Sequence, residues 1–348
     1  PNPSILELLW RTHKRCGQEE LKQTVLLTLE KMCQGGIYDH LGGGFSRYST
    51  DAIWLAPHFE KMLYDNAQLL DLLTWAWQET NELLFKLRAQ ETVDWVLREM
   101  IGEGGGFAAT LDADSEGEEG KFYVWNQTEI ESILEQHAPL FIEAYDVHTA
   151  GNWEGKTILN RTNNDRPYST EEEGILADCR DQLFAERKKR IHPGWDDKVL
   201  ADWNGLMIAA IAHTGTVFNQ DEWVNAAQRA FDFVVKTMSE NGKLYHAYRD
   251  GKVNHTATLD DYTGMIRAGI SLYEITGAPN CLTAAESWVT VVNDQFWDQE
   301  DGGYFFTADD AEALIVRTKS AADNATPAGN SVMVANLARL YYLTGNTA

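Results

Sequence analysis

The chain has 348 residues, and its 53 acidic and 29 basic side chains give a formal net charge of −24 at pH 7. This excess of acid argues against nucleic acid as a partner, because proteins bind a polyanion through clustered Lys and Arg side chains. The 44% hydrophobic and 11% aromatic content excludes a disordered chain. No apolar run approaches the roughly 18 residues that a membrane span needs, and no signal segment is evident, so we expect a cytoplasmic protein without a membrane partner.

Helical stretches that end in Gly or Asn recur along the chain, at residues 5–17, 69–81, 206–215, 269–277 and 337–345. Both residue types stop helices because they adopt the left-handed backbone conformation at little cost. The stops are 62 to 68 residues apart except for one interval of 134 residues, which is about twice as long. This spacing predicts a degenerate additional copy at residues 140–151.

A second helix follows each short turn, and we expect these helices at residues 19–34, 82–101, 222–239 and 279–296. Each leads into a long loop in which Gly-Gly-aromatic sequences indicate tight hairpins. Short turns on one side and long loops on the other predict an all-α fold, an (α/α)6 toroid with short β-hairpins in its long loops. We expect a single toroid domain over residues 1–348, with its last hairpin incomplete. An α-solenoid is the alternative fold, but its repeats are usually shorter, at about 34 to 47 residues.

Polar residues collect where the first helix of each hairpin begins, and in a toroid these helix starts face one mouth. The polar set comprises His58, Glu60, Lys61, Asp65, Asn66, Asp202, Trp203, Asn204, Asp260, Asp261, Tyr262, Asp323, Asn324 and Asn330. Asp and Asn also cap helix N-termini, so one such residue per helix needs no further role. Capping does not explain Glu60, Lys61 and Asp65 within two turns, or the adjacent pair Asp260 and Asp261.

Aromatic side chains are frequent near the same mouth. Aromatic faces stack on sugar rings, and carboxylates accept hydrogen bonds from sugar hydroxyls, although such rings also fill the junctions between loops and helices. The acidic loop that begins at Asp112 lacks the spacing of a calcium loop and is typical of a solvated charge run. We therefore expect a pocket for a sugar or sugar derivative. The residues expected to bind it are His40, Trp54, Lys61, Asn66, Asp112, Asp202, Trp203, Asn204, Asp260, Tyr262, Asp323, Asn324 and Asn330.

Acid–base chemistry on a bound sugar needs two proton-transfer groups, at least one of them with a pKa moved toward neutrality. Two carboxylates suit glycoside hydrolysis, whereas two histidines, or a histidine and a carboxylate, suit epimerisation. Asp65 and Asp261 are the predicted catalytic groups, Glu60 is a rival carboxylate, and His58 and His40 are available bases. The sequence does not choose between these pairs.

The four cysteines are far apart, and no His or Cys cluster has the spacing of metal ligands. We therefore expect no metal and no redox dithiol in this chain. The triple glycine at residues 42–44 lies outside the strand–loop–helix context of a phosphate-binding turn, so no nucleotide or other cofactor is expected.

Residues 35–70 (GGIYDHLGGGFSRYSTDAIWLAPHFEKMLYDNAQLL) resemble the signature of the spermatogenesis-associated protein 20 family, with its bacterial thioredoxin-domain-containing relatives. Further motifs similar to those of the family lie at residues 111–125, 151–159, 197–205, 259–268 and 323–330. The resemblance implies an N-terminal thioredoxin-like domain followed by a six-hairpin toroid similar to N-acylglucosamine 2-epimerases and glycosidases. This chain would then be the toroid of a longer protein, covalently linked in the parent chain to the thioredoxin-like domain.

The resemblance implies a fold but no reaction, since one fold hosts many functions. The leading hypothesis is a carbohydrate-active enzyme, either a sugar epimerase or a glycosidase-like hydrolase. The alternatives are a non-catalytic toroid that binds a glycan or peptide for the thioredoxin-like domain, and a mouth filled by a partner protein.

Overall fold

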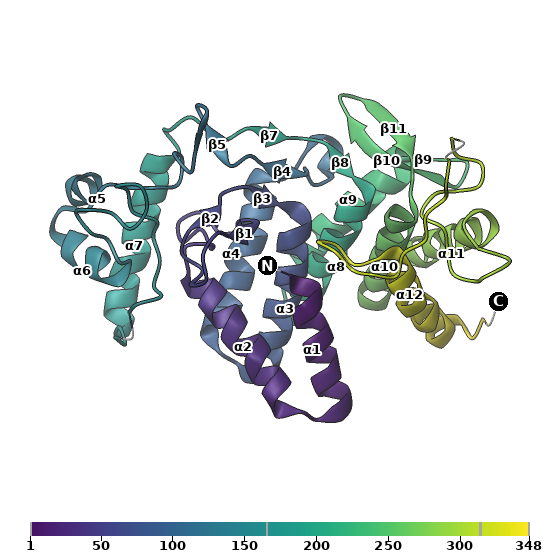
Figure 1. Ribbon diagram of the computed structural model, residues 1–348, viewed down its shortest axis with the longest axis horizontal. Coiled ribbons are helices and arrows are strands. Elements are labelled where there is room, and N and C mark those ends of the chain that lie inside the picture. Colours follow the sequence, from purple (N-terminus) through teal and green to yellow (C-terminus); the bar gives the residue numbers. More distant parts are fainter. Residues whose placement is uncertain (1, 165, 313–314, 347–348) are drawn as a thin grey trace.

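A computed structural model describes residues 2–164, 166–312 and 315–346. Helical hairpins are arranged around a central space, and their inner helices pack side by side in chain order (Figure 1). The inner helices are α1 (Pro3–Cys16), α3 (Leu63–Thr80), α8 (Ala201–Val217), α10 (Leu259–Thr276) and α12 (Gly329–Thr344). Their outer partners are α2 (Glu19–Gln34), α4 (Leu83–Glu99), α9 (Asp221–Thr237) and α11 (Pro279–Gln295). The predicted all-α toroid of hairpins is confirmed.

The short turns between inner and outer helices are mostly those predicted. Gly17, Asn81, Gly277 and Gly345 have φ values of 71°, 58°, 70° and 71°, in the left-handed region that stops a helix. The turn after α8 differs, because the helix continues through Gly215 to Val217. A Cβ atom at Gly215 would lie 3.0 Å from a methyl group of Val224, so this glycine permits close packing of α8 on α9 rather than ending the helix.

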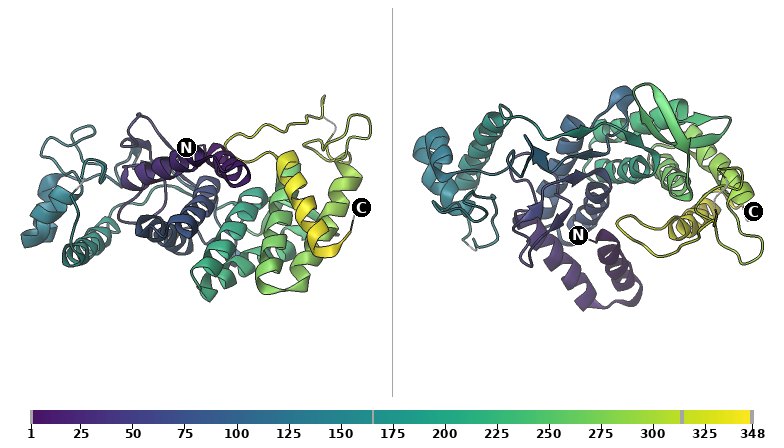
Figure 2. Two further views of the ribbon diagram at one scale, coloured as in Figure 1. Left: turned by 90° about the horizontal axis from the view of Figure 1, so that it is seen from below. Right: turned by 45° about the horizontal axis from the view of Figure 1, so that its top comes forward.

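The segment predicted as the additional copy does not join the ring of inner helices. Within the described residues, 126–187 forms α5 (Gln127–Leu134), the short η2 (Glu135–His137), α6 (Ala138–Ala144) and α7 (Thr170–Arg187). These helices bury an apolar cluster of their own, which includes Trp125, Phe141 and Leu176, and α3 packs directly against α8. We call α5, α6 and α7 the side cluster. In both views of Figure 2 it lies at the opposite end of the molecule from α11 and α12.

Short antiparallel strands lie within the long loops, as predicted. β1 (Tyr48–Ser49) pairs with β2 (Pro57–His58), and β5 (Asp114–Ser115) pairs with β6 (Glu118–Glu119). A second group runs in the order β3 (Lys61–Met62), β4 (Thr110–Leu111), β7 (Trp195–Asp196). A third group consists of β8 (Val199–Leu200), β9 (Ser239–Glu240), β10 (Lys243–Arg249) and β11 (Lys252–Thr256), with β10 at its centre. The short 3-10 turn η1 (Glu103–Gly105) lies in the loop that follows α4.

Two glycines set how closely α8 and α10 approach each other. A Cβ atom at Gly205 would lie 2.3 Å from the backbone of Gly264, a distance that real Cβ atoms do not reach. A Cβ atom at Gly264 would in turn lie 3.0 Å from the carbonyl oxygen of Asp202. The two backbones are therefore nearly in contact at the starts of these helices, which brings Asp202 to Asp261.

Among the described residues, we find no helix with the length and apolar character that crossing a membrane requires.

Candidate active site at the toroid mouth

Two short strands are each followed directly by an inner helix, and these two helices are neighbours in the ring. β3 ends at Met62 and α3 begins at the next residue, and β8 ends at Leu200 where α8 follows in the same way. The rings of Tyr64 and Trp203 meet edge to face with centroids 4.7 Å apart, so the first turns of α3 and α8 are in contact. This contact places Asp65 and Asp202 on the same rim of the mouth.

Asp65 is a buried carboxyl group in the first turn of α3. It is 2% exposed, and its Oδ2 atom has no hydrogen-bond partner among the described residues. Helix capping does not explain it, because the N-cap of α3 is Met62 and Asp65 accepts no bond from the helix start. Burial raises the pKa of Asp65 to about 7. A carboxyl group kept in the interior with no hydrogen bond, and with a pKa near neutrality, is a candidate for proton transfer.

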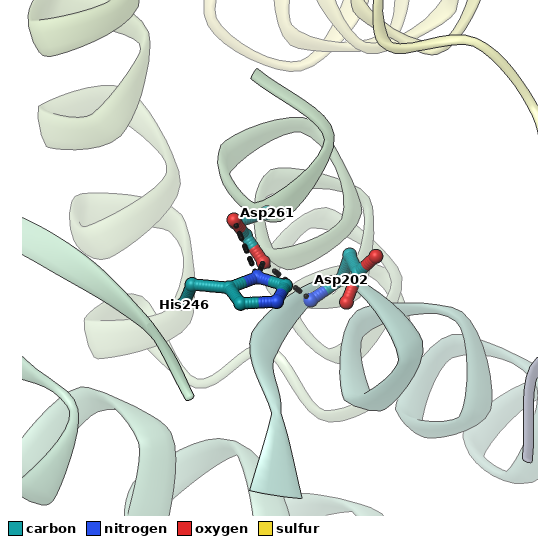
Figure 3. Close-up of side chains that lie close together, drawn as sticks. All are labelled: Asp202, His246 and Asp261. Carbon is teal, nitrogen blue, oxygen red and sulfur yellow. Dashed lines mark hydrogen bonds and ion pairs between the residues drawn. The ribbon is translucent and has the colours of Figure 1, made fainter. Parts of the chain in front are cut away.

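Asp202, His246 and Asp261 meet at the starts of α8 and α10 (Figure 3). Nδ1 of His246, on β10, lies 2.9 Å from Oδ1 of Asp261, and the other ring nitrogen faces the side on which Asp202 lies. Asp202 donates its backbone N–H to Oδ1 of Asp261 at 3.1 Å. Among the described residues, the Asp202 carboxylate accepts one hydrogen bond, from the backbone N–H of Trp203, which leaves its other oxygen for a ligand.

The electrostatics of this trio favour the protonated forms of Asp202 and His246. Burial, together with the neighbouring Asp261 carboxylate, raises the pKa of Asp202 to about 8. The hydrogen bond to Asp261 raises the pKa of His246 to about 9, although burial opposes this shift. Because the two groups interact, their protons belong to the pair, and together they can supply or accept a proton near neutral pH.

Both carboxylate oxygens of Asp261 accept hydrogen bonds from neighbouring groups. It is completely buried, and Oδ2 accepts the backbone N–H of Thr258 at 2.7 Å and the Thr258 hydroxyl at 2.8 Å. Oδ1 accepts the bonds from His246 and Asp202. With both oxygens occupied, Asp261 serves as the reciprocal partner of the N-cap Thr258 and as the group that orients His246. A catalytic role for Asp261 stays a prediction.

The same trio is the place where a metal could bind. One carboxylate oxygen of each aspartate and one ring nitrogen of His246 lie within 4.8 Å of one another. The chemistry of these donors would suit a divalent cation. However, a cation would have to displace the proton on His246 and compete with the bonds that Thr258 donates to Asp261.

The remaining acids of the mouth lie around the start of α12. Asp260 accepts the backbone N–H of Gly329 at 2.9 Å, and burial raises its pKa to about 6. Asp323 accepts the backbone N–H of Ala328 at 2.8 Å, whereas Asn324 bonds to the backbone of Ala325 and is exposed. Asp260 is thus close to the candidate pair, while Asp323 and Asn324 shape the loop that leads into α12.

Three predicted ligand-binding amides are occupied by the backbone instead. Asn66 accepts the N–H of Phe45 at 2.7 Å and donates to the Phe45 carbonyl at 2.9 Å. Asn204 holds Phe107, and Asn330 holds Tyr304, through the same pair of bonds. Each asparagine therefore clamps the aromatic residue of a Gly-Gly-aromatic turn to an inner helix. Since these amides are satisfied internally, the structure provides no means for them to orient sugar hydroxyls.

Lys61 and His40 are also buried away from the mouth. Lys61 is 1% exposed and donates to Asp39 at 2.8 Å, and Arg187 of α7 binds the same carboxylate at 2.7 and 2.8 Å. Although burial opposes the shift, these two cations hold the pKa of Asp39 far below its usual range. His40 bonds the carbonyl of Gly35, and burial lowers its pKa well below the ordinary value. This ion cluster joins the side cluster to the ring.

The other predicted residues lie on the outer rim or in the core. His58 stacks on Tyr48 and binds Glu119 at 2.7 Å, and Glu60 binds Arg47 at 2.9 Å. Glu60 and Asp112 line a separate shallow pocket of about 400 Å³. Trp54 and Tyr262 instead pack against the core, and the Tyr262 hydroxyl accepts the N–H of Leu244. Trp203 alone of the three predicted aromatic residues lies beside the acids.

Sequence reasoning missed His246, which is the histidine that faces these acids. It lies on a strand in the loop between α9 and α10, 15 residues before Asp261, so no helical spacing connects the two. The available signal was the strand pattern KLYHAYR ahead of the Asp260–Asp261 pair. A strand that pairs with β8 must bring its side chains to the start of α8.

Comparisons with known proteins identify the relatives of this chain. No family model matches it. Human spermatogenesis-associated protein 20 is 33% identical over 99% of this chain and 50% of its own length, and the rat protein gives the same values. The chain is homologous to spermatogenesis-associated protein 20. An uncharacterised protein of Caenorhabditis elegans is 29% identical over 93% of the chain. The chain spans about half the length of these relatives.

Solved structures agree on the fold. The GH76 α-mannanase of Bacteroides thetaiotaomicron superposes with a TM-score of 0.57 and 11% identity, over 99% of this chain and 70% of its own. An unsaturated glucuronyl hydrolase specific for heparin gives a TM-score of 0.56 and 9% identity, over 97% and 73%. This chain thus shares the helical toroid fold of these two solved structures. At such low identity the likeness concerns the fold alone.

Proposed function

We propose that the toroid mouth is the active site of a carbohydrate-active enzyme that works by acid–base catalysis. The observation that carries this proposal is the pairing of Asp202 with His246, a carboxyl group and an imidazole oriented by Asp261. Asp65 lies on the same rim as a second acid, whose Oδ2 atom has no hydrogen-bond partner among the described residues. The shared fold with an α-mannanase and a glucuronyl hydrolase supports a sugar-type ligand.

The groups divide the proton transfers as follows. Asp202 and His246 hold protons at neutral pH and deliver one to a leaving or ring oxygen of the sugar. Asp65 is half ionised at about pH 7 and accepts a proton from water or from a carbon next to a carbonyl. Trp203 offers its ring for stacking. Hydrolysis and epimerisation both need one group that donates a proton and another that accepts one, and the identity of the substrate decides between the two reactions.

The thioredoxin-like domain of the parent chain stays a prediction. A single toroid domain over residues 1–348, joined to such a domain, would process its sugar independently of any redox step.

The test is a thermal-shift screen against neutral monosaccharides, amino sugars, uronic acids and oligosaccharides, followed by NMR of each stabilising sugar incubated with the protein. We expect conversion of a sugar by the wild type, and a loss of at least about 100-fold in kcat for Asp65→Asn and Asp202→Asn with binding retained. Asp181→Asn, which changes an exposed acid on α7, is the matched control and should keep full turnover. Binding without conversion would favour the non-catalytic toroid, and full turnover by Asp202→Asn would refute the assignment.

A further inference from the structure

A cavity of about 760 Å³ lies between the inner helices. All five inner helices α1, α3, α8, α10 and α12 contribute to its wall, as does the segment before α12 that contains Asp323 and Pro327. Its volume falls within the range of about 300 to 1,000 Å³ that is typical of small-molecule sites. Of the acids placed at the mouth, Asp323 lines this cavity, whereas Asp65, Asp202, Asp260 and Asp261 are not among its lining residues.

A buried carboxylate organises the cavity wall. Asp71 of α3 is 7% exposed and accepts bonds from Nδ1 of His213, on α8, at 3.1 Å and from the Arg267 guanidinium, on α10, at 2.7 Å. The interaction fixes the imidazole ring of His213, whose side chain keeps 32% exposure, so its other ring nitrogen is available. Three inner helices thus present a rigid donor and acceptor array to the cavity.

The carboxylates of this wall (Glu7, Asp71, Glu274 and Asp323) outnumber its three guanidinium groups. Arg267 is paired with Asp71, Arg11 is paired with Glu7 at 2.7 Å, and Arg339 is paired with Glu274 at 2.6 Å. Because every guanidinium of the wall already faces a carboxylate, the cavity has no excess positive charge for a phosphate or carboxylate ligand. It offers hydrogen-bond donors and acceptors in alternation, beside the ring of Trp75. Such a surface suits an uncharged, hydroxyl-rich ligand.

The cavity lies close to the mouth along the toroid axis. Asp71 follows Asp65 by six residues on α3, which corresponds to about 9 Å along a helix. At the other wall Pro327 lies two residues before Gly329, which binds Asp260 of the mouth. The cavity wall and the mouth site thus share α3 and the segment at the start of α12.

We propose that this cavity is a second carbohydrate subsite, which binds an uncharged sugar unit through His213 and Arg267. The inference rests on the proposed function and narrows it. The substrate is an oligosaccharide or glycoside whose reacting unit lies at Asp202 and whose next unit extends into the toroid, rather than a free monosaccharide or an acidic sugar.

The experiment uses the complete chain with ring-labelled histidines, observed by NMR during titration with cellotriose, maltotriose, mannotriose and chitotriose and with the matching monosaccharides. We expect a trisaccharide to shift the signals of both His246 and His213, and a monosaccharide to shift only that of His246. His213→Gln should lower the ratio of trisaccharide to monosaccharide affinity about tenfold or more, as expected for lost hydrogen bonds in a desolvated site. His148→Gln is the control, since His148 also pairs with an aspartate, Asp146, but lies outside the cavity.

The outcomes separate this inference from the proposed function. A sugar that is converted without any shift of the His213 signal overturns the cavity subsite and leaves the mouth assignment intact. A trisaccharide that shifts the His213 signal but is never converted supports the subsite and contradicts the enzyme. No shift of the His213 signal with any saccharide of the panel, or an unchanged affinity ratio in a folded His213→Gln variant, overturns the subsite. Arg267→Gln gives a second, independent variant for the same ratio.

Discussion

A comparison of Asp65 with Asp261 distinguishes a functional role from a structural one at the start of an inner helix. Aspartates at helix starts are ordinary caps, and Asp261 behaves as such a residue because all its bonds are accounted for by Thr258, Asp202 and His246. Asp65 occupies a similar place on α3 but is buried with its Oδ2 atom unpaired among the described residues. A buried group that destabilises the fold and forms no stabilising contact in exchange is expected at sites where catalysis uses the group.

The raised pKa of Asp65 predicts a pH-dependent loss of stability. Because the folded state holds the proton more tightly than the unfolded state, stability is fully present below about pH 4 and is lost as the pH rises to about 7. The change in pKa from 3.8 to about 7 corresponds to roughly 4 kcal/mol. Asp65→Asn, which cannot ionise, should lose less stability between pH 5 and pH 8 than the wild type, as measured by urea unfolding at each pH.

The exposed Asp112→Asn is the control and should follow the wild type at both pH values. Equal losses of stability in Asp65→Asn and the wild type would contradict the burial of an ionisable group at this position.

At the level of single residues, sequence analysis located the mouth acids but could not assign their partners. Which oxygen bonds to which donor depends on how helices and strands meet. Asn66, Asn204 and Asn330 illustrate this limit, because their positions at helix starts are equally compatible with ligand binding and with clamping a turn. His246 was missed because its strand approaches the site from a loop far from the helical pattern.

At the level of elements, hairpins and turns were predictable because they depend on local signals. Apolar spacing identified α2, α4, α9 and α11 to within two residues at each end, and left-handed Gly and Asn residues identified most turns. The inner helices begin earlier than predicted, since polar residues such as Asp65 interrupt the apolar pattern of their first turn. The side cluster was misplaced because spacing alone cannot tell whether a helix packs in the ring or on its own core.

The ion cluster of Asp39, Lys61 and Arg187 should hold the side cluster to the ring. Asp39→Asn leaves two buried cations without their anion, so we expect a loss of about 3–5 kcal/mol in the free energy of unfolding. The side cluster should also become sensitive to proteolysis before the ring does. Urea unfolding and limited proteolysis followed by mass spectrometry measure the two effects.

Arg166→Ala is the matched control, because Arg166 forms exposed ion pairs within the same part of the chain. It should leave stability and proteolysis unchanged. A loss below about 1 kcal/mol for Asp39→Asn, with unchanged proteolysis, would show that apolar packing alone holds the side cluster.

At the level of the whole molecule, the toroid gathers acids from three inner helices at one end. The close approach of α8 and α10 at Gly205 and Gly264 brings Asp202 to Asp261, and the contact of Tyr64 with Trp203 brings α3 alongside. Burial at this end raises the pKa of both Asp65 and Asp202, so the arrangement of the helices favours the protonated forms of these acids.

The central claim is that two acids at the mouth keep their protons near neutral pH, ready for transfer. The most direct measurement is a pH titration of ¹³C-labelled aspartate carboxyl groups by NMR, with signals assigned through Asp65→Asn and Asp202→Asn. We predict one carboxyl group that titrates at about pH 7 and vanishes in Asp65→Asn, and another at about pH 8 that vanishes in Asp202→Asn. If both carboxyl groups titrate below about pH 5, like ordinary aspartates, the acid–base site proposed here is contradicted.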